Sequence, residues 1–112
     1  SDSTLTQGCI VARADKFSDY ELKTFLDEYK ASIDYMNDGA NIDDAAALTE
    51  KYGIVGAAAI AKKAIPDAGL AFIIGADNMK TALGDYFTVL FDADAKSVGG
   101  KVPADDIYYE VK

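Results

Sequence analysis

The chain has 112 residues, half of them hydrophobic, and its 19 acidic and 11 basic residues give a formal net charge of −8. This length suffices for one domain, 1–112, and the apolar fraction suffices for a hydrophobic core. The negative charge argues against nucleic acid as a partner, because lysine and arginine must neutralise phosphates there. It also argues against binding to an anionic membrane surface.

Histidine is absent, and Cys9 is the only cysteine. Histidine is the commonest general acid or base and the commonest ligand of transition metals, so arrangements that need it cannot form within this chain. A single cysteine excludes an internal disulfide and a structural zinc site built from several cysteines. The sequence therefore predicts a protein that is not an enzyme and that holds neither a cofactor nor a metal.

The first predicted element is a strand over residues 6–13. The run TQGCIVAR is short, apolar and rich in β-branched residues, which is typical of a strand buried on both faces. Within it, Cys9 is expected to be a small buried hydrophobic side chain.

A long helix is predicted next, from Ser18 to about Asn37. Ser18 and Glu21 have the spacing of a capping box, and the sequence Asn-Asp-Gly ends the helical pattern. Apolar residues recur between them at helical spacing, which predicts one core-facing stripe. These residues are Leu22, Phe25, Leu26, Tyr29, Ile33 and Met36.

Two alanine-rich helices should follow. Asn41 is predicted to cap the first, with Asp43 and Asp44 in the opening turn, where the helix dipole favours acids. A glycine, Gly53, is expected to terminate it. The second is predicted over about 55–65, where a proline stops it. Alanine faces on both helices would let their axes approach closely.

The carboxyl-terminal half is predicted to begin with a second buried strand, 70–74. Asp77 should cap a fourth helix, in which Gly84 suggests that another segment packs closely. The tail has a Gly-Gly turn and ends at 107–109 in either a short edge strand or a docked extension. The apolar face of the fourth helix comprises Met79, Leu83, Tyr86, Phe87, Leu90 and Phe91.

These elements together predict a helix-rich α/β fold with about four helices and two main strands. Two strands alone do not make a stable sheet, and central parallel strands need neighbours on both sides. The rest of the sheet is therefore expected to come from another chain or from a missing amino-terminal part of the same protein.

Five runs of this sequence, in this order, resemble the carboxyl-terminal part of a known family. They are TQGCIVAR, FSDYELKTFLDEYKASIDYMN, DDAAALTEKYGI, AAAIAKKAIP and FIIGADNMKTALGDYFTVLFDADAKSVGGKVPADDIYY. The family comprises the bilobed solute-binding proteins of ABC importers, of the type II periplasmic-binding-protein-like fold. The closest resemblance is to the group for nitrate, sulfonates, taurine and thiamine precursors, and it covers residues 6–109.

The resemblance implies one part of a two-lobed α/β protein that closes on a small polar solute and delivers it to the membrane permease of an ABC transporter. It implies an extracytoplasmic location, in the periplasm or at the cell surface, either soluble or lipid-anchored through an amino-terminal region that precedes these residues. By analogy, Thr6, Gln7, Gly8 and Cys9 would contact the ligand. The alternative is a free-standing helical interaction domain that binds no ligand and forms a homodimer, or another homo-oligomer, by pairing its strands across chains.

Overall fold

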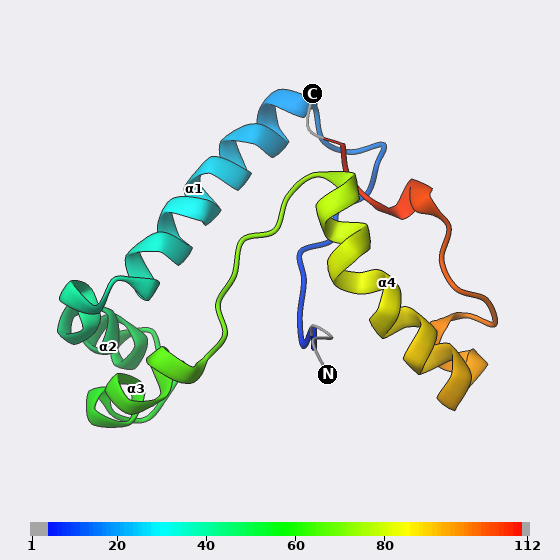
Figure 1. Cartoon of the computed structure of the whole chain (residues 1–112). Coiled ribbons are helices and arrows are strands. Elements are labelled where there is room, and N and C mark those ends of the chain that lie inside the picture. Colours follow the sequence, from blue (N-terminus) through cyan, green and yellow to red (C-terminus); the bar gives the residue numbers. More distant parts are fainter. Residues whose placement is uncertain (1–4, 111–112) are drawn as a thin grey trace. The chain divides into compact units, whose positions relative to one another are not determined.

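The computed structural model describes residues 5–110, and within them all regular secondary structure is helical (Figure 1). The α-helices are α1 (Asp19–Asn37), α2 (Ile42–Lys51), α3 (Ala58–Ala64) and α4 (Ala76–Ala93). Four short 3₁₀ turns accompany them: η1 (Gly39–Asn41), η2 (Ile65–Asp67), η3 (Ala95–Val98) and η4 (Asp105–Ile107). The prediction of about four helices is confirmed.

Contacts divide the chain into two compact units. Tyr20–Phe72 form one, which we call the inserted unit. The described residues up to Asp19 and from Ile73 onward form the other, which we call the flanking unit. Every buried residue among those described lies in the inserted unit, so the flanking unit has no buried core of its own.

Helix α1 has the predicted limits. It begins directly after Ser18 and ends at Asn37. The next residue, Asp38, has an extended backbone, and its carboxylate accepts a hydrogen bond from the Ala40 amide at 3.0 Å. The Asn-Asp-Gly sequence therefore stops the helix because the aspartate side chain satisfies a backbone donor of the following 3₁₀ turn.

The core of the inserted unit lies between α2 and α3. The predicted alanine faces, 45–47 and 57–59, form only part of it, because Ala47 and Ala59 are exposed and α3 contributes Ala61 instead. Ala45 and Ala46 of α2 pack with Ala61 of α3 and with Ile65, and all four are buried. Small side chains on both helices allow this close approach. Half-buried apolar residues pack around this cluster: Met36, Ile42, Val55 and Ala58.

The ends of these two helices differ in part from the prediction. Helix α2 has Asp43 and Asp44 in its first turn, and Gly53 follows its end with a positive φ of 71°, as expected. However, the Asn41 side chain does not cap α2. The turn η1 leads directly into the helix, and the Asn41 amide nitrogen donates instead to the Tyr35 carbonyl oxygen at 3.2 Å.

Helix α3 begins at Ala58, about three residues later than predicted. Its first amide, that of Ala58, donates to a carboxylate oxygen of Glu50 at 2.6 Å. This contact bridges α2 and α3 and satisfies a backbone donor that the helix itself leaves without an acceptor.

Replacing Glu50 by alanine is therefore expected to lower the free energy of unfolding by about 1 kcal/mol, the usual cost of losing a helix cap. Glu50→Gln keeps an oxygen acceptor without the charge and should cost less. Urea denaturation followed by circular dichroism measures both. Equal losses for the two variants would show that the hydrogen bond is not the source of the effect.

The predicted strands are absent from the described residues, so the α/β fold class and the inference of an incomplete sheet are wrong. Residues 6–13 form no helix or strand, and all of them except the half-buried Thr6 are exposed, with Val11 85% exposed. Cys9 is likewise exposed and not buried. A strand requires a neighbour for its ladder hydrogen bonds, and residues 5–110 provide none for this segment.

The second predicted strand, 70–74, is not formed, and residues 70–72 contact helix α1 instead. The Leu70 carbonyl oxygen accepts a hydrogen bond from the Asn37 side chain at 2.9 Å. The Phe72 ring lies against the Tyr29 ring, with a centroid separation of 6.2 Å. Leu70 and Phe72 therefore contact α1 in place of a second strand, whereas Ile73 stays 45% exposed.

Helix α4 and the tail complete the flanking unit. Helix α4 begins after Gly75, which has a φ of 93°, so Asp77 lies in its first turn and does not cap it. Nothing lies within 4 Å of a Cβ built on Gly84, and the expected close neighbour is absent from the described residues. The Gly99-Gly100 turn is confirmed, with φ values of 77° and 87°. Residues 107–109 form no strand.

Candidate functional site

The four predicted ligand contacts lie together in one exposed segment. Gln7, Gly8 and Cys9 are exposed, and Thr6 is half-buried. Within residues 5–110, no side chain from another element forms a hydrogen bond, ion pair or ring contact with them. These residues therefore present polar groups to solvent without forming an enclosed site.

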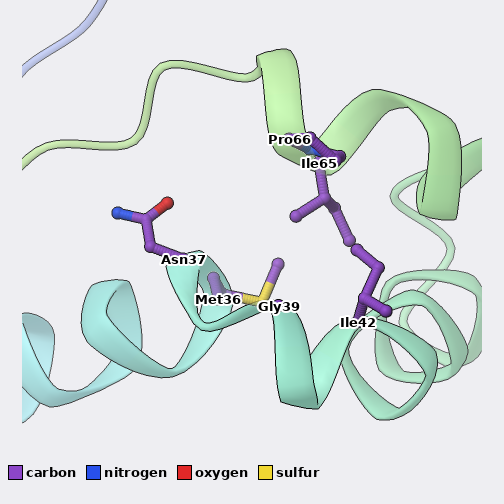
Figure 2. A pocket seen from close by; sticks show the side chains of 6 residues that line it. All are labelled: Met36, Asn37, Gly39, Ile42, Ile65 and Pro66. Atoms are coloured by element: carbon purple, nitrogen blue, oxygen red, sulfur yellow. The ribbon is translucent and has the colours of Figure 1, made fainter.

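A concave site occurs in the inserted unit, where the end of α1 meets the turn that follows α3. Its volume is about 380 Å³. Figure 2 shows that the walls come from the end of α1, from η1, from the first residue of α2 and from η2. The lining residues are Met36, Asn37, Gly39, Ile42, Ile65 and Pro66.

The apolar wall of this pocket is continuous with the core. Ile65 is buried, with 8% of its surface exposed, and Ile42 and Met36 pack against the same cluster. In Figure 2 the Ile42 and Ile65 side chains point toward one another, with the Met36 thioether beside them. The wall is held in place by the same contacts that hold α2 and α3 together.

Asn37 supplies the polar side-chain group of the pocket. Its amide nitrogen donates to the Leu70 carbonyl oxygen at 2.9 Å, which fixes the orientation of the side chain. The amide oxygen accepts no hydrogen bond from the described residues and lies on the side of the amide toward Ile65 and Pro66 in Figure 2. The pocket therefore combines an apolar wall with one oriented acceptor.

Sequence reasoning did not identify this pocket. Met36 was assigned to a core-facing stripe, and Ile65 to the end of a helix. The only local signal was the Asn-Asp-Gly break, which places a chain reversal beside Asn37. The other wall comes from Ile65 and Pro66, which are far away in the sequence.

Polar contacts join the tail to the rest of the flanking unit. Lys80 of α4 forms an ion pair with Asp105 of η4, with a nitrogen–oxygen distance of 2.9 Å. The hydrogen bond with Asp105 and the charge of its carboxylate raise the pKa of Lys80 above its ordinary value. Partial burial raises the pKa of the Tyr109 hydroxyl. The charge of Asp19 and a hydrogen bond between Asp19 and Tyr109 raise this pKa further.

The Tyr109 hydroxyl is expected to ionise only above its ordinary pKa of 10.0. Because the folded pKa is raised, the stabilising contribution of Tyr109 is complete below pH 10.0 and is lost as the pH rises through the folded value. Asp19→Asn should lower the pKa of Tyr109 toward the ordinary value, whereas Asp92→Asn on α4 should leave it unchanged. NMR titration of the tyrosine rings measures this pKa, and an unchanged value in Asp19→Asn would contradict the assignment.

Metal coordination has no candidate among the described residues, which contain no group of three or more cysteine, aspartate or glutamate side chains placed to hold an ion. In residues 5–110, no helix has the length and apolar character needed to cross a membrane.

Comparison of the chain with family models, with curated proteins and with solved structures found no match.

Proposed function

We propose that this chain is the carboxyl-terminal part of an extracytoplasmic solute-binding protein that serves an ABC importer. It contributes to the capture of a small polar solute, which the whole protein delivers to the membrane permease. In this role it performs no chemistry. The polar groups of half-buried Thr6 and exposed Gln7, together with the backbone of Gly8 and Cys9, contact the solute.

The order of the helices supports this proposal. In the resemblance, a long helix ends near an asparagine, an alanine-rich helix ends in KYG, and a final helix leads into an SVGG turn. Helix α1 ends at Asn37, α2 ends immediately before Tyr52 and Gly53, and α4 precedes the turn at Gly99-Gly100. This support concerns the helices alone, because the strands that the resemblance implies are absent from residues 5–110.

The observation that carries the proposal is the exposure of apolar side chains in the flanking unit. Ile10 is 55% exposed, Val11 85% and Ile73 45%, and no described residue of this unit is buried. Covering a large aliphatic side chain is worth about 1.5–3 kcal/mol, so a unit that leaves such residues open gains stability from further polypeptide. The amino-terminal part of a solute-binding protein would provide that cover.

The test is to isolate the protein from the cells that make it, through an affinity tag placed after Lys112. We expect an extracytoplasmic polypeptide longer than these 112 residues. One solute among taurine, an alkanesulfonate, nitrate and a thiamine-precursor pyrimidine should raise its melting temperature. At one hundred times Kd the gain is about 2.7 kcal/mol, which corresponds to a shift of several degrees.

A variant locates the solute on this chain. Gln7→Ala should reduce the shift in melting temperature, whereas Tyr52→Ala, at an exposed residue of the inserted unit, should not. A captured polypeptide of 112 residues whose melting temperature responds to none of the four solutes would contradict the proposal.

The same exposed side chains also favour a second candidate, a free-standing interaction domain that forms a homodimer. Light scattering of the purified chain separates the two. A dimer mass that persists on dilution supports the homodimer, whereas a monomer mass excludes it.

A further inference from the structure

We propose that the pocket of the inserted unit binds a small neutral or cationic molecule with an apolar body and one N–H or O–H donor, of the class of indoles and arylamines. None of Thr6, Gln7, Gly8 and Cys9 lines this pocket, and the inference does not depend on the proposed transport function.

The size and the wall of the pocket select the apolar body. Its volume of about 380 Å³ lies at the lower end of the range for small-molecule sites, about 300–1,000 Å³. Ile65 is fixed by the core, while Met36 is half-buried and has an adaptable, polarisable thioether. A flat ring can therefore lie between a rigid aliphatic surface and a side chain that adjusts to it.

The polar group of the pocket selects the donor. The hydrogen bond from Asn37 to the Leu70 carbonyl oxygen uses the amide nitrogen and leaves the amide oxygen to accept. An acceptor already fixed in orientation binds a ligand donor without a further cost of ordering its side chain. Asn37 is exposed, so a molecule of the same shape without an N–H or O–H group would leave this oxygen to water and forgo the hydrogen bond.

Charge excludes anions from the pocket. Two aspartates, Asp38 and Asp67, adjoin the lining residues in sequence, and both are exposed. No basic residue lines the pocket, and the chain has a formal net charge of −8. The local field therefore favours neutral or cationic ligands over carboxylates.

The experiment is an NMR titration of the full chain with indole, observed at the methyl groups of Met36, Ile42 and Ile65. We expect saturable shifts confined to these methyls, with a Kd of about 1 mM for a ligand of this size. Two matched probes test the polar selection. 1-Methylindole lacks the donor and indole-3-acetate carries a negative charge, and each should bind about two- to tenfold more weakly.

A variant that adds volume at the pocket wall tests its location. Gly39 lies in the wall, has an ordinary backbone conformation, and has nothing within 4 Å of a built Cβ. Gly39→Leu should therefore fold normally and weaken indole binding at least about tenfold. The matched control is Gly84→Leu, which adds the same side chain to an equally open position on α4 and should leave Kd unchanged.

Three results would overturn the inference. The first is the absence of saturable shifts, and the second is equal binding of indole and 1-methylindole. The third is a Gly39→Leu variant that has an unchanged circular dichroism spectrum and still binds indole as tightly as the original chain. Shifts spread over exposed residues such as Tyr52 and Ile60 would likewise show nonspecific adsorption to apolar surface.

Discussion

Replacing Ile65 by alanine is expected to lower the free energy of unfolding by about 2–4 kcal/mol. Ile65 is the largest side chain of the buried cluster between α2 and α3, and only 8% of its surface is exposed. Its neighbours Ala45, Ala46 and Ala61 are too small to fill the space that the substitution leaves. The loss is a large fraction of the roughly 5–15 kcal/mol by which a typical domain is stable.

Ile60→Ala is the matched control, because Ile60 lies on α3 and is 57% exposed. It should change the free energy of unfolding by less than about 0.5 kcal/mol. Urea denaturation followed by circular dichroism measures both variants. If the two lose equal stability, the cluster around Ile65 is not the core that holds the inserted unit together.

The second large effect is expected from adding volume at the same interface. Ala45 is fully buried, with 0% of its surface exposed, and it faces α3 across a close contact. Ala45→Leu places a branched side chain where no space exists, so the helices must separate or the side chain must adopt a strained rotamer. The expected cost is about 1–3 kcal/mol.

Ala47→Leu serves as the control, because Ala47 lies in the same helix on its exposed side. Leucine and alanine both favour helices, so this change should cost less than about 0.5 kcal/mol. Thermal denaturation should show a lower melting temperature for Ala45→Leu only. Equal melting temperatures for the two variants would contradict the close packing of α2 on α3.

The helices could be predicted from the sequence because their signals are local. Ser18 precedes α1, an Asn-Asp-Gly sequence ends it, and Gly53 follows α2 with the positive φ that glycine adopts readily. The exceptions also have local causes. Asn41 does not cap α2 because η1 precedes the helix, and α3 starts late because Glu50 binds the Ala58 amide.

The strands could not be predicted because a short apolar run does not specify what will cover it. The segment 70–74 has the composition of a buried strand, yet Tyr29 and Asn37 on α1 bind it instead. The segment 6–13 has the same character, but nothing among the described residues pairs with it. In both cases the deciding information lies in another segment.

The pocket was inaccessible to sequence reasoning for a related reason. Asn37 was recognised only as the end of a helix. Its contact with Leu70, which turns the amide oxygen toward the pocket, joins residues that are 33 positions apart. A site of this kind arises from tertiary contacts between elements whose local patterns indicate only packing.

The division of the chain has a consequence for the order in which its parts acquire structure. The flanking unit is built from two stretches that the whole of the inserted unit separates. Bringing the ends of such a loop of ~50 residues together costs about 3.5 kcal/mol of chain entropy, plus a constant. The inserted unit needs only the closure of short connections between neighbouring helices, so in pulse-labelling hydrogen exchange its amides should gain protection first.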